Sequence, residues 1–173
     1  PNRTELDIEG NPLLIKDSRG ITPDDDPEAY TYNHGNRVMT YVYALGGLQL
    51  FQDSMDAGRR WSLTNVLGNP IHGWDQRGHH LTTAYDDLLR PTHLWVEKDG
   101  ATQLVERLFY GEALDDPDTE EDEAADVNFR GELILHFDGA GLVRSDVLDF
   151  KGNLLAGSRI LAKGYQEVPD WKD

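Results

Sequence analysis

The sequence contains no cysteine, and this absence excludes several kinds of site at once. Disulfides, cysteine-ligated zinc, iron–sulfur clusters and thiol catalysis all require that residue. Basic residues are also scarce, since 16 Lys and Arg stand against 32 Asp and Glu and leave a net charge of −16. Such a chain lacks the basic face with which proteins bind nucleic-acid phosphates or anionic membrane leaflets.

Several sequence signals of other protein classes are missing as well. No apolar run approaches the ~18–20 residues of a membrane-spanning helix. Residues 1–30 lack the basic start and apolar centre of a secretory signal peptide. The chain has no Walker loop, no dinucleotide-binding glycine motif and no serine-hydrolase motif. We therefore expect no nucleic-acid partner, no membrane span and no cofactor.

What the chain does have is a short motif that recurs along its length, an Asp or Asn three residues before a Gly. An Asp or Asn side chain that opens a type I turn accepts hydrogen bonds from the backbone two residues later. Glycine at the fourth position takes a positive φ at no steric cost, and such a turn commonly joins two strands of a β-hairpin. The pairs predicted to form these structural turns are Asp7 and Gly10, Asp17 and Gly20, Asn65 and Gly68, Asp75 and Gly78, Asp138 and Gly141, and Asp149 and Gly152.

The spacing of the motif sets the length of the strands. Successive turns lie ten residues apart from Asp7 to Asp17 and eleven apart from Asp138 to Asp149. This leaves six or seven residues, about 20 Å, for each strand. The segments between turns alternate in polarity, as in residues 131–138, and this period of two is typical of half-buried strands. We predict an all-β protein of antiparallel hairpins that pair with their neighbours in sequence.

The remaining parts of the chain fit this pattern less well. Residues 104–110 are ambiguous between strand and helix, and residues 86–90 have room for one helical turn before Pro91. Less regular copies of the turn motif are expected at residues 33–36, 43–46, 86–89 and 97–100.

Some of these turns resemble the signature of a known family. An aromatic residue and Asp, two variable residues and then Gly occur at residues 74–78 and 137–141, and Tyr85-Asp86 repeats the pattern without its Gly. This is similar to the YD repeat of bacterial Rhs proteins. Longer stretches look closer still to the Rhs-like proteins related to insecticidal toxin complexes, namely residues 5–14, 54–61, 85–91 and 148–159.

The resemblance implies a fold, a role and a set of partners. In this family the repeats form a twisted sheet ribbon that spirals into a larger hollow shell, and the shell encloses a toxic C-terminal segment. Residues 1–173 would be a single YD-repeat segment of a longer chain, a non-catalytic wall of that shell. Its partners would be the remaining repeats and the enclosed toxin segment. The parent would be secreted or on the cell surface.

An acidic run at residues 115–126 interrupts the repeat. Eight of its twelve residues are Asp or Glu and none is basic. One interpretation is a calcium loop, since hard cations bind several oxygen ligands. The run contains no Gly for the sharp turn of such a loop, so we expect a solvated insertion between strands.

Other residue types leave two alternatives open. Histidines occur only as ordinary strand and turn residues, without metal-ligand spacing, at positions 34, 72, 79, 80, 93 and 136. A row of aromatic side chains would bind glycans or a partner protein, although cross-strand packing explains the same residues: Tyr30, Tyr32, Tyr41, Tyr43, Trp61, Trp74, Tyr85 and Trp95. A hydrolase with an unrecognised carboxylate pair is the less favoured alternative. We predict no catalytic residue and no metal ligand.

Overall fold

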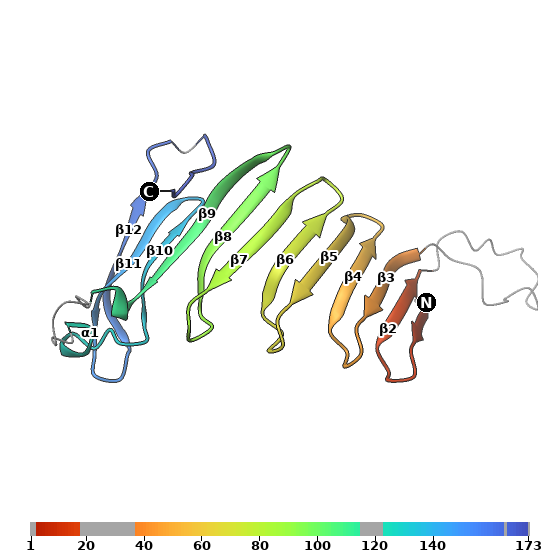
Figure 1. Ribbon diagram of the computed structural model, residues 1–173, viewed down its shortest axis with the longest axis horizontal. Helices are drawn as coiled ribbons and strands as arrows, with labels where there is room; N and C mark the ends of the chain where they lie inside the picture. The colour runs from red at the N-terminus through yellow and green to blue at the C-terminus, as the bar shows by residue number, and fades with distance from the viewer. Residues whose placement is uncertain (1–2, 18–36, 115–122, 165, 173) are drawn as a thin grey trace, which may run out of the picture. The chain divides into compact units, whose positions relative to one another are not determined.

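The computed structural model describes residues 3–17, 37–114, 123–164 and 166–172 (Figure 1). Regular structure in these residues is almost entirely β, with twelve strands, one short 3₁₀ helix and one short α-helix. The strands are antiparallel, and their order in the sheet is their order in the sequence, from β1 to β12. The predicted all-β fold of neighbouring antiparallel hairpins is therefore confirmed.

The chain divides into two compact units, residues 1–80 and 81–173. The first unit contains strands β1 (Arg3–Leu6), β2 (Pro12–Lys16), β3 (Arg37–Tyr43), β4 (Gln49–Ser54), β5 (Gly58–Thr64) and β6 (Pro70–Asp75). Strand β7 (His80–Tyr85) starts at the last residue of this unit.

The second unit continues with β8 (Pro91–Lys98), β9 (Ala101–Tyr110), β10 (Leu133–Asp138), β11 (Gly141–Leu148) and β12 (Leu154–Leu161). Between β9 and β10 lie the 3₁₀ helix η2 (Gly111–Leu114) and helix α1 (Glu123–Asp126). No helix in the described ranges is long and apolar enough to cross a membrane.

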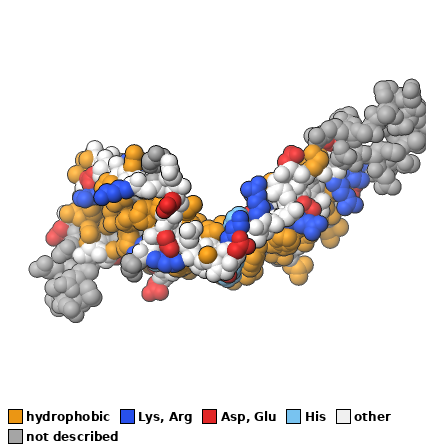
Figure 2. Space-filling model, turned by 90° about the horizontal axis from the view of Figure 1, so that it is seen from above, with side chains coloured by type: hydrophobic (Ala, Val, Ile, Leu, Met, Phe, Trp, Pro, Cys, Tyr) orange, Lys and Arg blue, Asp and Glu red, His pale blue; other side chains and the backbone are white. Residues whose placement is uncertain are grey.

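Few side chains in either unit are buried. The buried hydrophobic residues among those described are Leu104, Ala124, Ile134 and Leu148, all in the second unit. Figure 2 shows hydrophobic side chains on the surface of both units. An ordinary domain buries the apolar face of a sheet under a second layer of secondary structure. Most strand residues here are half-exposed, so each unit is held chiefly by its backbone ladder and its turns.

The segment after β12 returns to the second unit. The backbone N–H of Trp171 donates to the carbonyl of Leu104 at 2.9 Å, and the N–H of Leu104 donates to Asp170 Oδ1 at 2.9 Å. The indole N–H of Trp171 donates to the carbonyl of Asp138 at 3.1 Å, while its ring lies 5.0 Å from that of Phe137. These contacts fasten the end of the described chain to β9 and to the β10–β11 turn.

Two of the less regular turns need correction. The turn expected at residues 43–46 lies one residue later, because the N–H of Gly47 donates to the carbonyl of Ala44. Residues 104–110, ambiguous in the sequence, belong to β9. Residues 86–90 form the hairpin turn that the less regular motif at 86–89 predicts, with no helix.

The second correction concerns residues 97–100. There the hairpin closes through two residues, Asp99 and Gly100, since Lys98 pairs with Ala101. Both central residues have positive φ, which is the Asp-Gly form of a type I′ turn.

Candidate functional site

The predicted turns share one geometry, best seen at Asp7. The N–H of Gly10 donates to the carbonyl of Asp7 at 3.2 Å, and the N–H of Asp7 donates to the carbonyl of Asn11 at 2.9 Å. The carboxylate oxygen Oδ1 of Asp7 accepts the N–H groups of Glu9 and Asn11 at 2.9 and 2.8 Å. Gly10 has a φ of +90°. This is a type I turn followed by a left-handed residue, which bulges the hairpin.

The same pattern repeats in both units. In each copy one side-chain oxygen of the first residue accepts two backbone N–H groups, at distances between 2.8 and 3.0 Å. The copies open at Asn65, Asp75, Asp86 and Asp149. The turn at Ala44 keeps the backbone bonds without a side-chain acceptor.

A second oxygen of the turn carboxylate binds the fifth residue of the motif. Asp7 Oδ2 accepts from the Asn11 amide at 3.0 Å, and Asp149 Oδ2 accepts from the Asn153 amide at 2.9 Å. These side-chain bonds are the largest cause that lowers the pKa of Asp7 and of Asp149 below the ordinary value. The His79 ring, 2.8 Å from Asp75 Oδ2, likewise lowers the pKa of Asp75.

Two of the predicted pairs differ from this geometry or lie partly outside the described residues. Asp138 Oδ1 accepts the N–H groups of Ala140 and Gly141 at 2.8 and 3.1 Å, and Gly141 has a φ of +136°. A Cβ at Gly141 would lie 2.1 Å from the carbonyl oxygen of Ile160, so close backbone approach also requires glycine there. Asp17 is described, whereas Gly20 lies outside the described residues.

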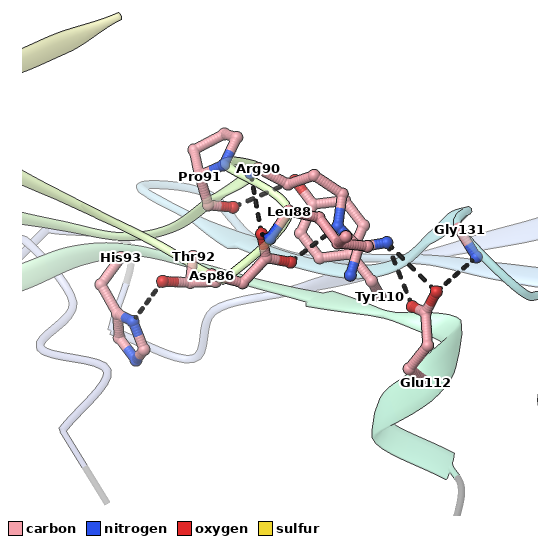
Figure 3. A network of polar contacts seen from close by, with 9 residues as sticks. All are labelled: Asp86, Leu88, Arg90, Pro91, Thr92, His93, Tyr110, Glu112 and Gly131. Carbon is pink, nitrogen blue, oxygen red and sulfur yellow. Dashed lines mark hydrogen bonds and ion pairs between the residues drawn. The ribbon is translucent and has the colours of Figure 1, made fainter. Parts of the chain in front are cut away.

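One turn carries a larger network than the sequence predicts (Figure 3). Arg90, the fifth residue of the Asp86 turn, donates from Nε to Asp86 Oδ2 at 2.7 Å. Its Nη1 donates to Glu112 at 3.1 Å, and its guanidinium carbon lies 4.1 Å from the centre of the Tyr110 ring. Glu112 also accepts the N–H of Gly131 at 2.9 Å. The network joins the β7–β8 turn to η2 and to the chain entering β10.

The chemistry of this network favours a structural role. Burial raises the pKa of Asp86, but the backbone N–H and the guanidinium of Arg90 outweigh it and leave the pKa low. The pKa of Glu112 is also lowered, first by a backbone hydrogen bond and then by Arg90. A general acid needs a raised pKa, so two carboxylates that are both held ionised do not form an acid–base pair.

The histidines lie beside aromatic rings or carboxylates. His72 Nδ1 and His80 Nε2 are 3.1 Å apart, and the Trp74 ring stacks on His80 at 5.0 Å with an interplanar angle of 7°. His93 stacks on Trp95 at 5.0 Å. Within the described ranges, no three His, Asp or Glu side chains are grouped to hold a metal ion. His34, Tyr30, Tyr32 and residues 115–122 of the acidic run lie outside those ranges.

Aromatic side chains of the first unit form a row across three strands. Phe51 pairs with Trp61 across β4 and β5, and Trp61 pairs with Trp74 across β5 and β6. The rings of Phe51 and Trp61 are 5.3 Å apart. Trp61 is 40% exposed and Trp74 is 38% exposed, so both keep free surface. Tyr41 and Tyr43 stack on each other at 6.2 Å.

Comparison with known proteins identifies solved structures that resemble this fold. No protein-family model matches the sequence, and no curated protein does. Among solved structures, the crystal structure of TcdB2-TccC3 matches with a TM-score of 0.76 and 26% identity over 99% of this chain. TcdB2-TccC3 without its hypervariable C-terminal region matches with a TM-score of 0.77 and 25% identity over the same share. The chain is related to the Rhs-like proteins of toxin complexes.

The relation concerns a small part of those proteins. This chain spans 8% of the length of each TcdB2-TccC3 chain. The fold also matches the Tc holotoxin pore of Photorhabdus luminescens, with a TM-score of 0.73, 24% identity, 99% of this chain and 8% of that one. The predicted Rhs-like relation to toxin complexes is thus confirmed.

The side-chain bonds within the turns have a local signal in the sequence. Position five of the turn holds a side-chain donor to the turn carboxylate: Asn11, His79, Arg90 and Asn153. An Asp followed four residues later by Asn, His or Arg is visible in the sequence. The contact from Arg90 to Glu112, 22 residues away, has no comparable local signal.

Proposed function

We propose that residues 1–173 are one wall segment of an Rhs-type β-shell that encloses a toxin, and that the segment has no catalytic activity of its own. The observation that supports this most directly is the likeness to TcdB2-TccC3 over 99% of the chain. The share of 8% in those proteins fits a segment of a much larger assembly.

The architecture suits a wall. Every strand pairs with its sequence neighbours, so the sheet extends by adding hairpins. The strand residues are half-exposed rather than gathered in a covered core. A repeat protein of this kind gains stability from each neighbouring repeat, and a segment therefore needs its neighbours on both sides.

The partners and the location follow from the same proposal. The partners are the remaining repeats of the parent shell and the toxin segment inside it. The acidic run at residues 115–126 is an insertion in the wall. The parent acts outside the cell that makes it, as a secreted or surface protein.

Electron microscopy of the full-length polypeptide tests the proposal. We expect a closed hollow particle with a protease-resistant segment inside it. An extended or solid particle, with the enclosed segment cut as fast as unfolded protein, would contradict it.

The aromatic row supports one second candidate, a β module that binds glycans or a protein. Trp61 and Trp74 keep about two-fifths of their surface exposed, and the ion pair of Arg59 and Asp53 lies on the strands beside them. An aromatic ring can stack on the apolar face of a sugar while neighbouring polar groups bind its hydroxyls. A glycan array with the Trp61→Ala and Trp74→Ala variants tests this candidate. Binding that both variants abolish would favour it over the wall. For the hydrolase alternative, the Asp86 and Glu112 carboxylates provide no support.

A further inference from the structure

Three turns of the first unit carry exposed apolar side chains at their tips. The connections of an antiparallel sheet of sequential hairpins alternate between its two ends, so the turns at residues 7–11, 44–48 and 65–69 share one end (Figure 1). The second residues of these turns are Ile8, Leu45 and Val66, exposed by 104%, 101% and 98%. We define the apolar rim as these three with two further exposed residues, Leu48 and Leu67.

The three turns of the rim lie next to one another. A Cβ placed on Gly47 would lie 4.0 Å from Asn11 Oδ1, and one on Gly68 would lie 3.9 Å from Leu48 Cδ2. Neighbouring turns are therefore within van der Waals reach of each other. Because each turn joins two strands, their tips repeat at roughly 10 Å, twice the strand separation.

Turn geometry alone does not explain these residues. The second position of a type I turn accepts most residue types and prefers proline, so nothing there requires Ile, Leu or Val. Side chains that are fully exposed add nothing to the packing of the unit. Contact of such apolar side chains with water is unfavourable relative to their burial.

The other end of the same unit differs in chemistry. Its described turn tips hold Met55, Asp56, Ala57, Gln76 and Arg77, all exposed. Apart from Met55, these are charged, polar or small. The contrast between the two ends is what an apolar contact at one end alone would produce.

We propose that the apolar rim docks against aliphatic turn tips of another repeat segment in the same polypeptide. This inference rests on the proposed function, because it takes the segment as part of a larger shell. The partner surface is apolar, since a charged partner would lose its hydration against the rim without gaining a counter-charge.

The size of the rim favours a partner in the same polypeptide over a second copy. A stable interface between separate chains takes about 20–30 residues a side, far more than the five of the rim. At low salt the net charge of −16 also opposes pairing of two copies. A partner in the same chain has an effective concentration of about millimolar, which suffices for a small contact. The toxin-complex relatives, of which this chain spans 8%, have ample length for such a partner.

Cysteine labelling tests the inference, because residues 1–173 contain no cysteine. The full-length polypeptide receives Leu45→Cys or Val66→Cys on the rim, or Gln76→Cys at the polar end as the matched control. Maleimide labelling of each site is followed by peptide mass spectrometry, in native buffer and in urea. We expect folding to slow labelling of both rim sites by at least about tenfold, and to slow the control by less than about twofold.

Three results would overturn the inference. Rim sites that label as fast as the control in the folded protein would show that nothing covers the rim. Equal slowing of all three sites would show general enclosure rather than docking of one rim. Slow rim labelling in a polypeptide that forms no hollow particle would exclude the proposed partner. A hollow particle whose rim sites label quickly would leave the proposed function standing, so the two failures are distinguishable.

Discussion

At the scale of single residues, each turn is stabilised by the backbone conformation of its fourth residue and by a side-chain oxygen of its first residue. Glycine at the fourth position supplies the positive φ, and the first residue ties two N–H groups to one oxygen. Leu89 stands where the other turns have glycine and has a φ of +61°. A leucine in this region is strained, so the backbone conformation of the Asp86 turn lowers the stability of the fold.

Substitution at the glycines tests this account. Gly78→Val places a β-branched residue at a φ of +83° with nothing within 4 Å of the new Cβ. We expect a loss of about 1–3 kcal/mol in the free energy of unfolding. Gly152→Val should behave similarly, since Gly152 has a φ of +78° and its new Cβ would displace only the flexible end of the Glu132 side chain, 2.7 Å away. Gly139→Val, in equally open space without a positive φ, is the matched control. Urea denaturation measures all three.

Leu89→Gly makes the opposite test. Removing the strain at a φ of +61° should stabilise the chain by about 0.5–1 kcal/mol, even though glycine adds entropy to the unfolded state. Differential scanning calorimetry should show a higher Tm. A Tm that falls would mean that apolar contacts of Leu89 outweigh its backbone strain.

The turn carboxylates also predict a dependence on pH. The folded-state pKa of Asp7 and of Asp149 is lowered, chiefly by the Asn11 and Asn153 amides. Their stabilising effect is therefore present above the unfolded pKa and is lost as the pH falls through the lower folded pKa. Thermal melts between pH 6 and 3 should show this loss. Asp149→Asn keeps an acceptor oxygen, as Asn65 does, and should flatten the profile; an unchanged profile would contradict the assignment.

At the scale of elements, the local features were predictable and the distant ones were not. The turn at Asp75 and the strands around it follow from residues within five positions of one another. The sequence does not predict the shift of one turn to Ala44–Gly47, because that turn lacks a side-chain acceptor. Strand β9 was ambiguous because Leu104, Leu108 and their neighbours fit both periods. The Arg90–Glu112 contact depends on how η2 returns to the sheet, which no local pattern encodes.

Helix α1 forms the last four residues of the acidic run. We expect the stability of the chain to be more sensitive to changes in α1 than to changes in residues 115–122. Ala124 is 0% exposed, and its carbonyl accepts the N–H of Phe129 at 2.7 Å. Replacing residues 115–122 by a Gly/Ser linker of equal length should be nearly neutral for stability. Ala124→Leu should cost about 1–3 kcal/mol through overpacking. Chemical denaturation with and without calcium measures both, and a calcium-dependent shift in the intact chain would reveal a cation site instead.

At the scale of the whole molecule, the end strand presents an exposed edge. All eight residues of β12 are exposed, including Leu154, Leu155, Ile160 and Leu161. β12 pairs with β11, and no other described strand pairs with it. A long, apolar strand edge is a template for pairing with another chain.

We therefore expect the isolated chain to self-associate as salt rises from low to physiological concentration. The charge of −16 opposes association at low salt, and salt screens it beyond about 8–10 Å. Hydrogen bonds between strand edges act at contact and are little screened. Light scattering across a salt series measures the effect, and Ile160→Glu, which replaces an apolar side chain of the edge by a negative charge, should suppress it. A compact monomer at high salt and high concentration would favour the self-sufficient binding module over the wall segment.

The strands lie in the sheet in the same order as in the sequence, and this has a consequence for biosynthesis and for unfolding under force. Each hairpin can form as soon as its second strand leaves the ribosome, without waiting for distant residues, because the strand contacts are sequentially local. The return of Trp171 to Leu104 is the late step, since 66 residues separate Asp170 from its partner. Pulled from its N-terminal end, the sheet would then come apart one hairpin at a time, in the order in which it was made.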